Sequence, residues 1–256
     1  MNAQGLDRAF ALLDGVGRSV PAWFTPYVDV GRRIAARRGV TLADALNAGL
    51  RPTALAAGPL RFVPQACLPQ DESYEAFIAR TAQVPTREHA HDLFNGLVWH
   101  RFPTLKRHLN ERQAHEIARH GIGPRRGAVR DALTLFDENA AWLQAPEALV
   151  DALRARAWHT AFITLRGAWQ DARLVIFGHA LLEQLLLTQH KGITAHVWAV
   201  PDGVEAEVHL AEALTPERLA RKADFPLPLA GVPGWYAGNE CASFYDDASV
   251  FRPLRR

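Results

Sequence analysis

Apolar residues along most of the chain recur three or four positions apart, the spacing that places them on one face of a helix. Prolines set some of the boundaries, and Thr86 is the candidate N-cap of the helix that follows Pro85. Residues 193–200, ITAHVWAV, alternate instead as a strand does. Helices are predicted over residues 70–82, 86–101, 104–120, 128–136, 146–162, 174–187 and 203–222.

The two ends of the chain interrupt these patterns with proline and glycine. Prolines between positions 21 and 69 allow only short helices there, for example over residues 41–50 with Thr41 as N-cap. We therefore predict an irregular N-terminal arm, residues 1–60, packed on a single domain formed by residues 61–256. The tail from residue 224 is rich in aromatic side chains, so we expect it to pack back across the core. The predicted fold class is mainly α with a few short strands (α+β), built as a single compact helical domain.

Composition limits the classes of protein to which the chain can belong. It is 48% hydrophobic and 22% charged, as in folded soluble proteins, and its net charge of +2 does not mark it for nucleic acid or membrane. No apolar run reaches the ~20 residues that a membrane span needs, and the first residues lack a signal-peptide pattern. Cys67 and Cys241 form no CxxC motif. We expect a reduced, cytoplasmic protein without a membrane partner, and the oligomeric state stays open.

The segment 88–110, EHAHDLFNGLVWHRFPTLKRHLN, combines polar groups with an apolar helical stripe. His91 and Asn95 are four residues apart, and Asp92 and Asn95 are three apart, so these residues follow one edge of the stripe. Groups of these types bind metals or move protons, and such an edge is where a cleft can open. An alternative of equal weight is that His91 and Asp92 only cap the helix or form ion pairs near its start.

A second polar pair lies in the most apolar segment, RLVIFGHALLEQLLLTQ. His179 and Glu183 are four residues apart, the spacing used by helical metal ligands and by acid–base pairs. The order differs from the HExxH zinc motif, and a lone histidine in an apolar helix is more often a satisfied core residue. Because burying an unpaired carboxylate is costly, Glu183 must have a partner.

Two further acidic groups follow apolar or aromatic stretches. Asp137, Glu138 and Asn139 come directly after the stripe of residues 128–136, and Asp246 and Asp247 lie among aromatic residues. Taken alone, the first group is typical of a solvated helix end and the second of a turn. If the helices pack on one another, however, the polar groups of all four segments must pair or gather around a ligand.

This convergence predicts a site for a divalent metal ion, the candidate cofactor. The assigned metal ligands are Asp137, Glu138 and His179. The assigned catalytic residues are His91, as proton shuttle, Asp92 and Glu183. Asn95 and Asn139 are assigned to substrate binding. The same groups can instead form a closed network that only holds the helices in register.

Residues 101–130 carry eight basic residues against two acidic ones, in a chain whose net charge is only +2. GIGPRRG within this segment lacks the Walker pattern, but Arg125 and Arg126 can clamp a phosphate. The leading hypothesis is therefore a metal-assisted hydrolase acting on a phosphate-containing small molecule or nucleotide. The alternative is a non-catalytic binding protein that contacts nucleic acid or an acidic partner through the basic 101–130 surface. A solvated basic helix pair is the simplest explanation of the charge.

Several motifs also occur together in an order that is specific: HDLFNGLVW, FPTLKRHLN, RDALTLFDENA, FGHALLE, ITAH and LPLAGVPGWYAGNE, followed by FYDD and VFRP. Over roughly residues 60–256 they resemble the bacterial family known as domain of unknown function 3025. The resemblance implies that these segments belong to one domain, and it implies no activity. A likeness to His-Asp phosphohydrolases rests on His91 and Asp92 alone, and His89 lies too close to be the upstream histidine of that family.

Overall fold

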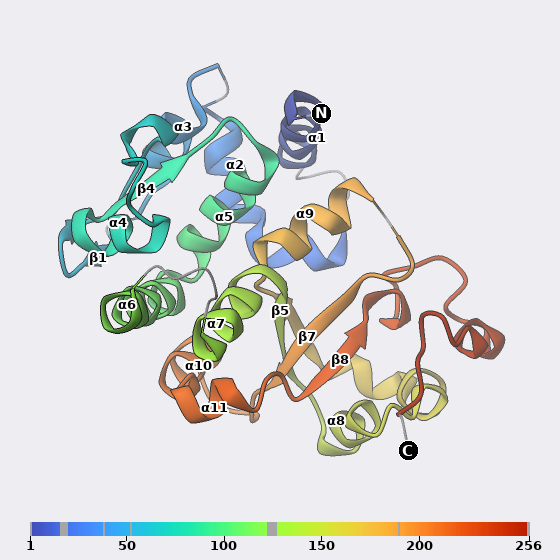
Figure 1. Ribbon diagram of the computed structural model, residues 1–256. Helices are drawn as coiled ribbons and strands as arrows, with labels where there is room; N and C mark the ends of the chain where they lie inside the picture. The colour runs from blue at the N-terminus through green and yellow to red at the C-terminus, as the bar shows by residue number, and fades with distance from the viewer. Residues whose placement is uncertain are drawn as a thin grey trace.

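The computed structural model describes residues 2–15, 20–37, 39–51, 53–121, 127–188 and 190–254 (Figure 1). Helices make up most of these residues, and the strands form one four-stranded sheet and two small two-stranded sheets. The fold class is therefore the predicted one, mainly α with a few short strands.

The N-terminal segment contains more helix than the proline spacing predicted. It holds α1 (Asn2–Asp14), a 3₁₀ turn (Ala22–Tyr27), α2 (Val28–Ala35) and α3 (Leu42–Gly49). Thr41 caps α3 as predicted, because its hydroxyl oxygen accepts from the backbone N–H of Asp44. The segment packs on the rest of the chain: Tyr27 is fully buried, and its hydroxyl donates to the Ile176 carbonyl over 2.6 Å. The boundary at residue 60 stays a prediction.

Two pairs of short strands follow. β1 (Ala54–Leu55) and β2 (Gly58–Pro59) form an antiparallel hairpin, whereas β3 (Arg61–Pro64) and β4 (Gln83–Thr86) pair in parallel. The connection from β3 to β4 contains a 3₁₀ turn (Gln65–Cys67) and α4 (Tyr74–Thr81). Asn47 of α3 joins this unit to the N-terminal helices, since its side chain donates to the Phe62 carbonyl and accepts from the Phe62 N–H.

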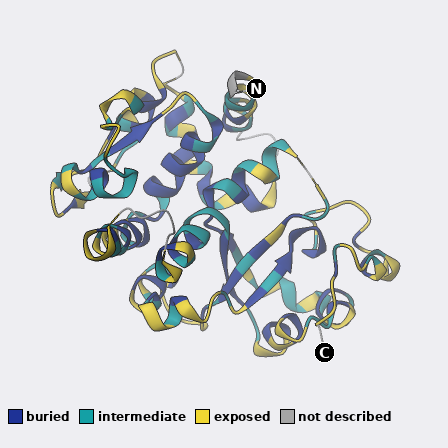
Figure 2. Ribbon diagram, viewed as in Figure 1, coloured by how far each residue is buried: buried dark blue, intermediate teal, exposed yellow. Residues whose placement is uncertain are grey.

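Three helices follow: α5 (Ala90–Arg101), α6 (Pro103–His120) and α7 (Ala128–Asn139). Figure 1 shows α5 in the interior of the molecule and α6 at its edge. The prediction that Thr86 caps α5 is wrong, because Thr86 is part of β4. His89 is the N-cap instead, and its ring Nδ1 accepts from the N–H of His91 over 3.0 Å. Almost the whole of α5 is buried (Figure 2), so its polar side chains need partners inside the protein.

The larger sheet has the strand order β6-β5-β7-β8. Its strands are β5 (Ala140–Gln144), β6 (Arg173–Ile176), β7 (Thr194–Ala199) and β8 (Phe225–Pro228). β7 confirms the one strand predicted from alternation. The helix predicted over residues 174–187 is wrong in its first part, because residues 173–176 pair antiparallel with β5, and α9 (His179–Leu187) begins only after Gly178.

The remaining elements pack on the sheet and on the helices. They are α8 (Glu147–Arg154), a π-helical turn (Thr160–Thr164), α10 (Ala206–Ala213), α11 (Pro216–Ala220) and 3₁₀ turns at Arg166–Gln170, Leu229–Gly231 and Ala242–Asp246. Helix α8 packs against β8, α10 against α6 and α11 against α7. The C-terminal tail packs back on the core as predicted, since Tyr245 stacks on Phe162 and Phe251 is buried against both rings. In the part of the chain that the structure describes, no helix combines the length and hydrophobicity that crossing a bilayer requires.

His100, near the end of α5, is a buried histidine whose titration affects stability. Its ring stacks on Phe62 with the ring centres 5.7 Å apart, and burial lowers its pKa from 6.5 to about 4. Because the folded-state pKa is the lower one, the unfolded chain takes up the proton more readily. The contribution of the neutral ring is therefore complete above pH 6.5 and is lost as the pH falls toward 4.

We predict that His100 accounts for a loss of about 2 kcal/mol in the free energy of unfolding between about pH 7.5 and about pH 5. His100→Phe preserves the ring stacking and removes the titration, so urea unfolding of the variant should depend less on pH by that amount. An equal pH dependence in the two proteins would contradict a neutral, buried imidazole at this position.

Candidate functional site

The end of α7 and the start of α9 lie side by side because of the way β5 and β6 pair. β5 follows α7 directly, α9 follows β6, and the two strands are antiparallel with Ala141 opposite Ile176. The N–H groups of Phe177 and Gly178 both donate to the Ala140 carbonyl, over 2.9 and 2.8 Å. This register places the last turn of α7 next to the first residue of α9.

Gly178 permits the close approach of these two segments. A Cβ atom at this position would lie 2.5 Å from the backbone nitrogen of Asn139 and would also collide with the Glu138 carbonyl oxygen. The φ of Gly178 is −57°, a value that any residue adopts, so the requirement for glycine is one of space. With this contact made, His179 begins α9 beside the carboxylate of Glu138.

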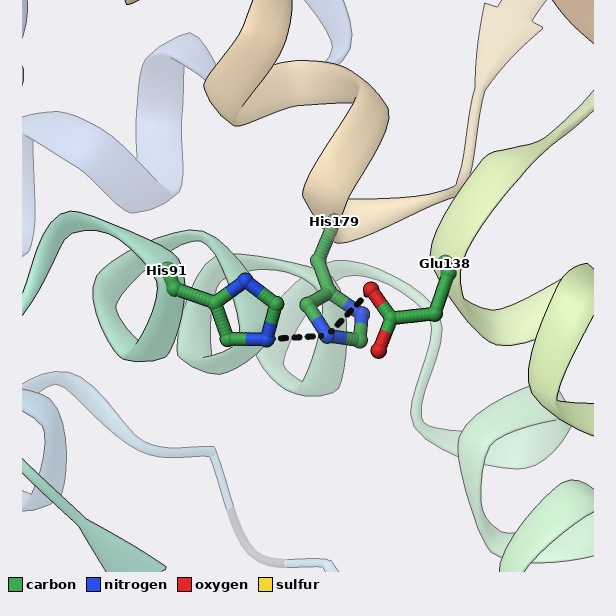
Figure 3. Close-up of side chains that lie close together, drawn as sticks. All are labelled: His91, Glu138 and His179. Atoms are coloured by element: carbon green, nitrogen blue, oxygen red, sulfur yellow. Dashed lines mark hydrogen bonds and ion pairs between the residues drawn. The ribbon is translucent and has the colours of Figure 1, made fainter.

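His91, Glu138 and His179 form a compact cluster where α5, α7 and α9 meet (Figure 3). Nε2 of His179 lies 3.1 Å from Nε2 of His91 and 3.4 Å from Oε2 of Glu138. One ligand atom from each residue lies within 4.8 Å of the other two. Two ligands held at ~2.0–2.1 Å from a tetrahedral zinc ion are roughly 3.3 Å apart. The spacing of the cluster therefore suits a single metal ion.

Each histidine of the cluster has a carboxylate near its other ring nitrogen. Nδ1 of His91 is 3.1 Å from Oε2 of Glu183, and Nδ1 of His179 is 3.8 Å from Oδ2 of Asp137. For His91, an N–H at Nδ1 that bonds to Glu183 leaves the lone pair on Nε2, the form in which histidine binds a metal. Nδ1 of His179 has no hydrogen-bond partner, and Asp137 lies near it without bonding to it. The partner that Glu183 was expected to need is therefore His91 of α5.

The surroundings of the cluster shift the pKa values of its members in different directions. Burial lowers the pKa of His179 to about 3, so its imidazole is neutral at physiological pH. The hydrogen bond to Glu183 raises the pKa of His91, whose proton can bridge the two Nε2 atoms when no metal is bound. Burial raises the pKa of Glu138. A metal ion and this proton compete for the same lone pairs.

Lys106 is a buried cation that the sequence assigned to a basic surface. It is 4% exposed, and its Nζ donates to both carboxylate oxygens of Asp137, over 2.7 and 2.9 Å, and to Oδ1 of Asn95 over 2.8 Å. Asn95 in turn donates to the Tyr74 hydroxyl over 2.9 Å. Burial on its own would raise the pKa of Asp137, but Lys106 and His179 bring it below its ordinary value. Asp137 is therefore an ionised group held in place on two sides.

The cluster and its neighbours line one open pocket of about 320 Å³. The size is at the lower end of the ~300–1,000 Å³ typical of small-molecule sites. Because the pocket is open, its polar groups are not sealed against one another. Besides the cluster, the polar lining residues include Tyr74, Arg87, Asp92, Asn95, Lys106, Asn110, Gln113 and Asp137.

The structure brings together most of the residues assigned from the sequence, but it places His91 and Asp137 differently from the assignment. His91 supplies a ligand atom to the cluster, whereas Asp137 lies behind His179 and outside the set of three. Asp92 lines the pocket, but its two oxygens bind the guanidinium and the backbone N–H of Arg87. Glu183 supports His91.

Other assigned residues lie away from the pocket. Asn139 occupies the last position of α7 and is not among the lining residues. Asp246 pairs with His159, and Asp247 pairs with Lys191, so the fourth polar segment does not join the site. Arg125 and Arg126 fall outside the described residues.

We predict that Gly178→Ala disrupts the contact between α7 and α9. A Cβ atom pressed against backbone cannot be relieved by a side-chain rotation, so the free energy of unfolding should fall by about 1–3 kcal/mol. Gly167→Ala is the matched control, because a Cβ there has nothing within 4 Å. Chemical denaturation measures both, and equal stability of the two variants would show that the close approach is absent.

Comparison with known proteins places the chain in a family. Residues 60–255 match the family described as Protein of unknown function (DUF3025), and the match includes every residue that lines the pocket. No curated protein and no solved structure matches the chain. Since the match covers most of its length, the chain belongs to the DUF3025 family.

Proposed function

We propose that the protein is a metal-dependent hydrolase whose divalent ion is held by His91, Glu138 and His179. The observation that supports this most strongly is the 3.1 Å approach of two Nε2 atoms with Glu138 beside them, at the wall of an open pocket. Two imidazole lone pairs at this distance repel each other unless a cation or a proton lies between them. Three protein ligands next to an open space are the arrangement of catalytic zinc sites, whereas structural sites are closed by four.

The donor set favours zinc among the common divalent ions. Two imidazole nitrogens and one carboxylate oxygen suit a borderline metal better than Mg²⁺ or Ca²⁺, which prefer oxygen ligands throughout. Bound there, the ion would lower the pKa of a water molecule and polarise a substrate oxygen. Glu183 would orient the imidazole of His91.

The pocket also supplies hydrogen-bond donors for a reacting group. Burial raises the pKa of Tyr74, so its hydroxyl keeps its proton while it accepts from Asn95. The Lys106 ammonium lines the same space. We assign the Tyr74 hydroxyl to the stabilisation of negative charge that develops on the substrate.

The finer parts of the sequence-based hypothesis stay predictions. A phosphate-containing substrate depends on Arg125 and Arg126, which lie outside the described residues. The alternative is binding of nucleic acid or an acidic partner by the basic 101–130 surface. This surface exposes fewer positive charges than the sequence suggested, because Lys106 and Arg130 are buried. A cytoplasmic location agrees with two cysteines, Cys67 and Cys241, that are free and exposed.

The metal centre predicts a graded loss of zinc affinity. The wild-type protein, stripped with a chelator, should bind one equivalent of zinc in a calorimetric titration. His179→Ala and Glu138→Gln remove a ligand and should weaken binding by more than about 100-fold, while Glu183→Gln, which only loosens His91, should cost about 10- to 100-fold. His115→Ala, an exposed histidine on α6, is the control and should bind normally. Equal affinities in all four variants would place any bound zinc elsewhere.

Hydrolysis is tested separately from metal binding. We expect the zinc-loaded protein to hydrolyse at least one member of a panel of small carboxylic esters, amides and phosphate esters. The activity should disappear in Glu138→Gln and on chelation, and zinc should restore it in the wild type. A protein that binds zinc at this cluster and turns over no member of the panel would contradict the hydrolase proposal and leave a structural metal.

A further inference from the structure

The pocket has an amide-rich wall beyond the metal cluster, and most of it comes from α6. Lys106, Asn110 and Gln113 are spaced four and three residues apart, so they lie on one face of that helix. All three are buried and line the pocket. Lys106 donates to Asp137 of α7. Two turns further along α6, Gln113 donates to Thr134 of α7 over 3.2 Å.

Asn110 is the member of this wall with a free hydrogen-bonding atom. Its Nδ2 donates to the backbone carbonyl of Glu75 in α4 over 3.0 Å, and a carbonyl can only accept, so the orientation of the amide is determined. Oδ1 is then the remaining atom, and it is buried with no partner in a residue only 6% exposed. A buried acceptor without a donor is costly, and a ligand that supplies an N–H or O–H removes that cost.

The charges on the pocket wall disfavour an anion at this position. Among the described lining residues, four carboxylates (Glu75, Asp92, Asp137 and Glu138) face two cations, Arg87 and Lys106. Both cations are already bound, Arg87 by Asp92 and Lys106 by Asp137. With a divalent ion bound, the positive and negative charges of these groups would cancel. No unpaired positive charge would then remain among these residues to bind a negatively charged group of the substrate.

We propose that the substrate is a small neutral molecule that donates a hydrogen bond from an amide or hydroxyl group to Oδ1 of Asn110 while its reacting group lies at the metal cluster. This inference rests on the proposed metal centre, and it specifies the substrate class. The cavity volume of about 320 Å³ limits that substrate to a small molecule.

Matched hydroxamates test the proposal, because a hydroxamate anchors one end of the probe at a metal ion. Three series differ only in the group at the far end: a primary amide, an isopropyl group or a carboxylate, all of similar shape. Each series has two to five methylene groups, so no distance between the metal and Asn110 is assumed. Binding to the zinc-loaded wild-type protein and to Asn110→Leu is measured by calorimetry, with acetohydroxamate as the probe that cannot reach Asn110.

At the best chain length, the amide-ended probe should bind the wild type roughly five- to tenfold more tightly than the isopropyl probe, the range expected for one hydrogen bond. The carboxylate probe should bind more weakly than the amide. In Asn110→Leu the advantage of the amide should vanish, while zinc and acetohydroxamate bind as in the wild type. The wild-type comparison stands even if the variant does not fold.

Two results would overturn the proposal while the metal centre stands. Equal binding of the amide and isopropyl probes would show that no ligand group bonds to Oδ1 of Asn110. Tightest binding of the carboxylate probe would indicate an anionic substrate, in line with the phosphate hypothesis. If neither zinc nor acetohydroxamate binds at all, the metal centre itself fails, and the substrate inference fails with it.

Discussion

The close contact between the backbone of Gly178 and the last turn of α7 is the constraint on which the site depends. The register of β5 and β6 decides which residues meet, and the missing Cβ of Gly178 lets the two chains approach until His179 faces Glu138. α5, packed against α9, then supplies His91. Three elements far apart in the sequence thus deliver two nitrogen atoms and one oxygen atom to a single point.

Charged and polar side chains are buried around this point. A chain of hydrogen bonds runs from Tyr74 through Asn95 and Lys106 to Asp137, and burying such ions is offset only when each has a partner. Behind the imidazole rings, Nδ1 of His91 bonds to Glu183 and Nδ1 of His179 has no hydrogen-bond partner, while the two Nε2 atoms point toward one another. The two Nε2 atoms and Oε2 of Glu138 are thus directed at a common point, as the donor atoms of a metal site are.

The sequence predicted some levels of this structure better than others. Helical periodicity is local, so it located α5, α6 and α7, and alternation located β7. The sequence pattern predicted residues 174–187 wrongly, because a buried strand and a buried helix both consist of continuous apolar residues. The polar residues of the site were recognisable, since charged groups in apolar surroundings demand partners. Their partners depend on long-range register, so the contact of Glu183 with His91 was not predicted, and Lys106, which follows the buried Leu105, was assigned to the basic 101–130 surface.

Diffraction from crystals grown with zinc, with data collected on both sides of the zinc absorption edge, tests the central claim most directly. The account predicts one anomalous peak within ~2.0–2.2 Å of Nε2 of His91, Nε2 of His179 and a carboxylate oxygen of Glu138, with the pocket side of the ion open to water. A peak bound by a different set of residues, or none at this cluster in zinc-saturated crystals, would contradict it.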